Sequence, residues 1–180
     1  MPLAEKFSIL VLILSIGAQL FGRPLFGKCI KPVFVFSVLG NFGYAFYLSF
    51  LQYHAFLQPY REWPYFAYYV GWRFFSPIIV ALVFALALKF ISEFLNRRFN
   101  ERFLEKEENW LFALGIFLTG YPGFLFYIPL MLVVGLFISA FYHFFGKGRA
   151  PFFYAWLPVA IFAILLKSLI PQSALNFLII

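Results

Sequence analysis

Few side chains in this 180-residue sequence could carry out chemistry, and their types exclude several kinds of site. The seven acidic residues are all glutamates, so the chain has no aspartate. The one cysteine, Cys29, excludes an internal disulfide and a cysteine-cluster metal site. His54 and His143 lie far apart among aromatic residues, a setting more typical of interfacial histidines than of ligands to a haem or metal. With no serine triad and no Gly-rich phosphate loop, the sequence predicts no cofactor.

Glu108 lies in the one long polar segment of the chain, residues 96–109. Basic and acidic side chains interleave there at helical spacing, which favours a short solvated helix. Charges of this density are costly in hydrocarbon. We therefore expect a connector at the membrane surface, with Glu108 solvated in it. The charged residues are Arg97, Arg98, Glu101, Arg102, Glu105, Lys106, Glu107 and Glu108.

The composition places the chain among integral membrane proteins. Hydrophobic residues make up 64% of it and charged residues 12%, with a mean hydropathy of +0.89. Soluble domains are about 45–50% apolar and about 25% charged. The net charge of +7 fits loops that face anionic headgroups, so we expect the lipid bilayer as a partner and no nucleic acid.

Apolar runs long enough to cross a bilayer predict an all-α transmembrane bundle, in one domain, of about six or seven membrane helices. The segment at 65–95 is too long for one untilted span, and Ser76-Pro77 offers a break in it. We therefore expect a short or re-entrant helix before this break and a basic loop at 23–32. The predicted spans are 7–21, 33–51, 65–75 (short), 77–95, 110–119 (short), 124–145 and 151–170.

Asn41 stands between Gly40 and Gly43 in the middle of the predicted span 33–51. Small residues let a neighbouring helix approach closely, and a buried amide needs a partner inside the bundle. We interpret this patch as a packing face, with ligand binding at Asn41 as the alternative.

The order of these parts resembles the membrane core of the type IV prepilin peptidases, aspartyl proteases that trim pilin leader peptides. Gln52 ends the second span, and Pro59 follows seven residues later. The segment EKEENWLFALGIFLTG aligns Glu108 with the family's second catalytic aspartate and Gly120 with a downstream glycine. Gly135 and the segment RAPFFYAWLP at 149–158 match a later helix glycine and the start of the closing helix.

The resemblance implies that Gln52 and Glu108 lie on the same, cytoplasmic side of the membrane and that 65–95 crosses it twice. It also implies a protein without the family's activity. The two-carboxylate chemistry needs an acid at both positions, and Gln52 carries an amide. The distribution of basic residues favours a different topology, in which 65–95 crosses once and nine Lys and Arg residues face inward. The break at Ser76-Pro77 favours the family arrangement.

Three functions are compatible with these observations. The first is a non-catalytic relative of the prepilin peptidases that binds a hydrophobic, pilin-like helix or supports a membrane assembly in a prokaryotic cytoplasmic membrane. The second is a small transporter or its substrate-binding subunit, which would use Asn41, Gln52 or the break at Ser76-Pro77. The third is a structural subunit of a larger membrane complex, suggested by the abundance of aromatic residues.

Overall fold

The computed structural model describes residues 3–58, 60–99, 104–145 and 152–170, and these residues contain helices and no strand. This confirms the all-helical fold. A π-helix, Gly71–Phe75, follows the third α-helix. The α-helices are α1 (Leu3–Leu20), α2 (Arg23–Ala55), α3 (Trp63–Val70), α4 (Ser76–Arg98), α5 (Lys106–Thr119), α6 (Phe124–Phe144) and α7 (Trp156–Leu169).

Among the described residues, four helical stretches are long and apolar enough to cross a bilayer, and α7 is a shorter apolar helix. Many large apolar side chains on them face outward, such as Leu14, Phe36 and Phe137. A soluble protein would not expose so much apolar surface. The helices therefore fit a membrane protein, as the composition predicts. The four stretches are Leu3–Leu20, Phe26–Ala55, Trp63–Arg98 and Phe124–Phe144.

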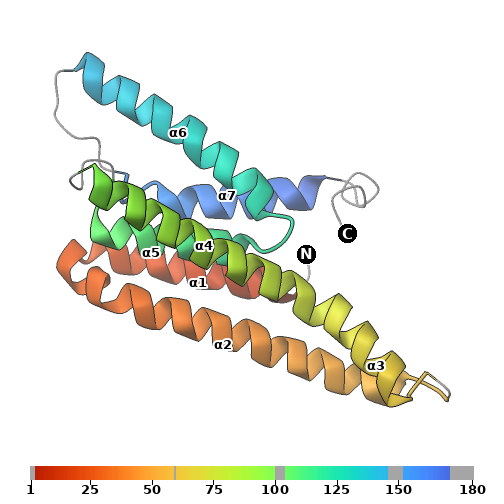
Figure 1. The fold of residues 1–180 in the computed structure, drawn as a ribbon. Coiled ribbons are helices and arrows are strands. Elements are labelled where there is room, and N and C mark those ends of the chain that lie inside the picture. Colours follow the sequence, from red (N-terminus) through yellow and green to blue (C-terminus); the bar gives the residue numbers. More distant parts are fainter. Residues whose placement is uncertain (1–2, 59, 100–103, 146–151, 171–180) are drawn as a thin grey trace.

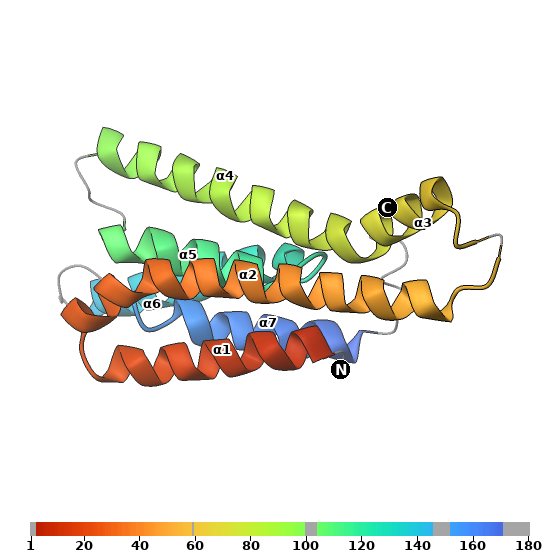
Figure 2. The ribbon, with the colours of Figure 1, turned by 90° about the horizontal axis from the view of Figure 1, so that it is seen from below.

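The helices lie side by side and run in alternating directions, so that successive connections fall at opposite ends of the bundle (Figures 1 and 2). The C-terminal ends of α1, α4 and α6 and the N-terminal ends of α2, α5 and α7 lie at one end of the bundle, which we call the connector end. The connections α2–α3 and α5–α6, together with both ends of the described chain, share the other. The turn between α5 and α6 contains the sequence GYPG, residues 120–123.

Helix α5 forms the centre of the bundle. It has 14 residues, a length of about 21 Å, which is short of a hydrocarbon core of about 30 Å. Almost every residue from Glu108 to Thr119 is buried, and α5 packs against α1, α2, α4, α6 and α7. Its apolar side chains do not need to face lipid, because the surrounding helices cover them.

Polar contacts between distant segments fasten this core at two places. Gln19 donates from Nε2 to the backbone oxygen of Phe153 (3.0 Å) and so joins α1 to the segment before α7. Tyr127, on α6, donates its hydroxyl to the backbone oxygen of Trp156 (3.3 Å). Both side chains are almost fully buried, where an unpaired polar group would be costly.

The expected loop at 23–32 is wrong, because α2 begins at Arg23 and runs for 33 residues. One proline falls in its first turn, where a helix needs no backbone donor. Pro32 lies inside the helix, a position that membrane helices tolerate more readily than soluble ones. The glycine and prolines of this segment therefore did not end the helix.

The stretch from Trp63 to Arg98 is helical throughout. The regular α-helix is interrupted by the π-helix at Gly71–Phe75, which directly precedes Ser76-Pro77. The chain bends there and continues towards the connector end without reversing (Figures 1 and 2). The prediction that 65–95 turns back and ends on the side where it began is therefore wrong for this fold.

Candidate functional site

The two positions suggested by the resemblance, Gln52 and Glu108, lie at opposite ends of the bundle. Gln52 belongs to the last turn of α2, which ends away from the connector end, whereas Glu108 belongs to the first turn of α5, at the connector end (Figure 1). The expectation that they share one side of the membrane is wrong in this structure. They cannot contribute to a common site.

Glu108 is 2% exposed, so the expectation that it is solvated is also wrong. It forms a capping box with Glu105 at the start of α5. Its Oε2 accepts a hydrogen bond from the Glu105 backbone N–H (2.9 Å), and the Glu105 side chain accepts one from the Glu108 backbone N–H. Reciprocal bonds of this kind satisfy backbone donors that a helix start leaves unpaired. Glu108 therefore has a structural role at this helix terminus.

Asn41 is half-buried, and its Nδ2 donates to the backbone oxygen of Ser37, one turn earlier in the same helix (2.9 Å). We expected the Asn41 amide to bond to a neighbouring helix, but its partner lies in α2 itself. Gly40 does pack closely, since a Cβ there would lie 2.8 Å from Phe7 of α1, but Gly43 has no neighbour within 4 Å and is exposed. Within the predicted packing face, the close contact with another helix is at Gly40 and not at Gly43.

A cavity of about 160 Å³, lined by both apolar and polar residues, lies between Asn41 and the C-terminal end of α5. Glu5 and Lys167 form an ion pair at its wall, with 2.9 Å between carboxylate oxygen and Nζ. Thr119 also lines it, and its hydroxyl donates to a backbone oxygen within α5.

The helices α4 and α5 are joined near the connector end by a polar network that the sequence analysis missed. Lys89 of α4 is 5% exposed and pairs with Glu93, with 2.7 Å between Nζ and Oε1. One helical turn further on, the hydroxyl of Ser92 donates to Asn109 Oδ1 (2.8 Å). Asn96 binds the backbone of Leu104 twice, as donor (2.6 Å) and as acceptor (3.0 Å). The network fixes the start of α5 against the end of α4.

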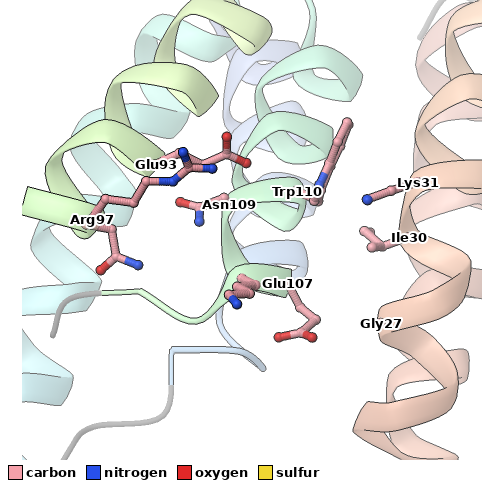
Figure 3. A pocket seen from close by; sticks show the side chains of 10 residues that line it. Gly27, Ile30, Lys31, Glu93, Arg97, Glu107, Asn109 and Trp110 are labelled. Carbon is pink, nitrogen blue, oxygen red and sulfur yellow. The ribbon is translucent and has the colours of Figure 1, made fainter. Parts of the chain in front are cut away.

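This network forms one wall of a pocket of about 360 Å³ at the connector end, where α2 begins, α4 ends and α5 begins (Figure 3). Ionisable side chains of both signs face it, and three cations against two carboxylates give its lining a net charge of +1. The lining residues are Gly27, Ile30, Lys31, Glu93, Asn96, Arg97, Lys106, Glu107, Asn109 and Trp110.

Glu107 and Arg97 are the pocket's free ionisable groups. Neither has a hydrogen bond or an ion pair with any part of the chain that the structure describes. Glu107 lies against Gly27 of α2, where a Cβ would come within 2.9 Å of its Cγ, so a larger residue at this position would displace the Glu107 side chain. Arg97 projects from α4 on the opposite side (Figure 3). The pocket thus offers one anionic and one cationic group to a ligand.

The face of Trp110 is the aromatic part of the pocket. Lys89 Nζ lies 4.3 Å from its ring centroid and Lys31 Nζ lies 5.7 Å from it. Cations at these distances are attracted to the negative face of an indole ring. Through Trp110, α5 therefore contacts Lys31 of α2 and Lys89 of α4, and both ammonium groups lie near the pocket.

The signal for this site was present in the sequence as LALKFISEF. Ionisable residues inside an apolar span are functional candidates by default, and Lys89 and Glu93 stand one helical turn apart. Among the described residues, no group of three His, Cys, Asp or Glu side chains could hold a metal ion. The arrangement is suited to binding charged groups by hydrogen bonds and ion pairs.

Comparisons with protein-family models, with curated proteins and with solved structures found no match to this chain. Fold and site together define a helical membrane protein with a polar pocket at one end of its bundle.

Proposed function

We propose that this protein is a non-catalytic integral membrane protein that binds the charged flank of a hydrophobic helix belonging to a partner protein. The observation that carries the proposal is the pocket at the connector end, with Glu107 and Arg97 free to pair with a ligand. A membrane-spanning helix ends in such a flank, which often contains residues of both signs.

We further propose that the connector end faces the cytoplasm of a prokaryotic cell. Six described basic residues belong to helix ends there: Arg23, Lys28, Lys31, Arg97, Arg98 and Lys106. Cytoplasmic ends of membrane helices carry an excess of Lys and Arg. In this arrangement α1, α2, α3–α4 and α6 cross the bilayer, while α5 and α7 lie between them, which gives about six membrane helices.

The binding test uses a dansyl-labelled synthetic peptide with a 20-residue apolar helix and a flank containing Lys and Glu. The protein is reconstituted in phosphatidylcholine vesicles, and energy transfer from tryptophan to dansyl reports binding. We expect the charged-flank peptide to bind at least about tenfold more tightly than one with a Ser-Gly flank, a difference of about 1.4 kcal/mol. Glu107→Gln and Arg97→Gln should each remove most of this preference. Arg98→Gln is the matched control, because Arg98 is exposed and does not line the pocket. Equal binding of the two peptides would refute the proposal.

The same peptide tests the absence of catalysis. Glu93 and Glu107 are two carboxylates on one pocket, so the assay must look for cleavage as well as binding. We expect mass spectrometry to recover the peptide intact after prolonged incubation. Cleavage that disappears in Glu93→Gln or Glu107→Gln would show that the protein is an enzyme.

A second candidate function is that of a small transporter. Cavities that contain polar side chains lie at both ends of α5, and they favour transport because a solute path needs polar groups on each side of a barrier. The test is uptake of labelled arginine or glutamate into proteoliposomes. Uptake that depends on Arg97, Glu107 and Asn41 would favour transport over helix binding.

A further inference from the structure

An apolar groove that the proposed function does not use is larger than the two cavities described above. It has a volume of about 900 Å³ and lies at the bend between α3 and α4, beside the turn that leads into α6. Aromatic and aliphatic side chains make up most of its lining. The lining residues are Tyr65, Tyr68, Tyr69, Trp72, Arg73, Phe74, Ser76, Pro77, Val80, Phe84, Tyr121, Pro122, Phe124 and Leu125.

Arg73 is the one ionisable lining residue apart from the tyrosines, and it is exposed. It has no hydrogen bond, ion pair or cation–π contact with another described residue. Yet it belongs to Trp63–Arg98, a stretch apolar enough to span a bilayer. A guanidinium in or near hydrocarbon is costly unless an anion or water reaches it. Arg73 is therefore a candidate to bind an anionic group from outside the chain.

The backbone at this point is unusual as well. Arg73 is the central residue of the π-helix Gly71–Phe75. Single π-helical turns inside α-helices are rare and occur frequently at functional sites. Here the π-turn accompanies the bend between α3 and α4, and its side chains Trp72, Arg73 and Phe74 all line the groove.

The rest of the lining matches a lipid. Tyr65, Tyr68 and Trp72 are exposed. Exposed tyrosine and tryptophan side chains are enriched at the headgroup level of membranes. Deeper in the groove, Phe84 of α4 stacks on Phe124 of α6 with 4.9 Å between ring centroids, which gives an apolar floor. An amphiphile with an acidic head and hydrocarbon chains would satisfy both parts of the surface.

The volume argues against a protein helix as the occupant. A 20-residue helix is about 30 Å long and about 10 Å wide, which gives a volume on the order of 2,000 Å³. The groove holds less than half of that. Sites of about 300–1,000 Å³ are typical for small molecules.

We propose that this groove is a specific site for an anionic glycerophospholipid, with its phosphate on Arg73 and its acyl chains along Phe84 and Phe124. The aromatic residues at the mouth surround the glycerol backbone. The site is independent of the polar pocket, which lies at the other end of the bundle.

The test is native mass spectrometry of the delipidated protein titrated with phosphatidylglycerol or with phosphatidylcholine of the same acyl chains. We expect at least about tenfold tighter binding of phosphatidylglycerol. Arg73→Gln should reduce its binding to the phosphatidylcholine level, and Arg73→Lys should retain most of the preference. Arg98→Gln, which removes an exposed arginine at the connector end, is the matched control and should change nothing. Equal binding of both lipids, or equal losses in the Arg73→Gln and Arg98→Gln variants, would overturn the proposal.

A second measurement locates the acyl chains of the bound lipid. Phosphatidylglycerol brominated on its acyl chains should quench wild-type tryptophan fluorescence more than that of Trp72→Phe, because the bromines would lie beside Trp72. Inorganic phosphate in excess should not displace the lipid, since the groove also binds the chains. Quenching that is the same in both proteins, or full displacement by phosphate, would exclude the proposed binding mode.

Discussion

Lys89 and Glu93 form an ion pair of 2.7 Å on α4, inside a stretch apolar enough to span a bilayer. The lysine is almost completely buried and also lies over the face of Trp110 on α5. A buried charge is tolerated when its partner and hydrogen bonds replace water. The pair thus connects the core of the bundle with the wall of the polar pocket.

Removing one member of this pair should destabilise the protein. Lys89→Met leaves Glu93 without its partner, and the loss of a buried partner costs about 3 kcal/mol. We expect a clear decrease of the melting temperature in detergent, followed by tryptophan fluorescence. The double variant Lys89→Met/Glu93→Leu should recover much of the loss, because no uncompensated charge remains. The exposed Lys6 provides the control, Lys6→Met, which should melt like the wild type. A double variant no more stable than the single one would contradict the argument.

Gly115 and Gly43 should respond oppositely to the same substitution. A Cβ on Gly115 would overlap the hydroxyl of Tyr127, which is fully buried and bonded to Trp156. Gly115→Ala should therefore cost about 1–3 kcal/mol. Gly43 is exposed on α2 with no neighbour within 4 Å, so Gly43→Ala should stabilise the helix by about 0.5–1 kcal/mol. Thermal melts of both variants test this prediction. If Gly43→Ala were destabilising, Gly43 would belong to a packing face, as the sequence predicted.

Glu108 should tolerate glutamine better than alanine. Glutamine at this position can still accept the hydrogen bond from the Glu105 backbone, as in other capping boxes. Alanine removes that bond and should cost about 1 kcal/mol. Glu62→Ala is a suitable control, since Glu62 precedes α3 without making a side-chain cap. If Glu108→Gln were as destabilising as Glu108→Ala, the negative charge itself and not the capping bond would be the important property.

The membrane class and most helix positions follow from the sequence, because the length of an apolar run is a local property. The long helix from Arg23 was not foreseen. Proline and glycine predict a break, and whether a helix tolerates them depends on its surroundings. The role of Glu108 was also hidden, since glutamate is an unusual residue at the N-cap position that Glu105 occupies.

The site could be predicted only in part. Lys89 and Glu93 were recognisable as charges inside an apolar span, but their pocket depends on how α2, α4 and α5 meet. For example, Gly27 and Glu107 are 80 residues apart in the sequence but lie in contact in the pocket. This contact is purely tertiary. Spacing within one helix likewise could not tell that Gly40 faces α1 while Gly43 faces outward.

The final prediction concerns topology, on which the resemblance and the structure differ. Helix α2 ends at one end of the bundle, and the continuous helical stretch Trp63–Arg98 returns the chain to the other (Figure 1). In a Cys29→Ser background, single cysteines at Gln58 and Arg98 should therefore label from opposite sides of the membrane. Both positions are exposed, so each should react with a membrane-impermeant maleimide on its own side. The experiment uses sealed vesicles of known orientation.

A third cysteine, at Lys28, supplies the internal control. Lys28 is exposed near the start of α2, and α2 begins at the connector end, where α4 finishes. It should therefore label together with Arg98 and not with Gln58. Labelling of Gln58 and Arg98 from one side would mean that 65–95 crosses the bilayer twice, as the prepilin peptidase arrangement requires. The polar pocket would then have to be sought between other helix ends, because α2, α4 and α5 could not meet where this structure brings them together.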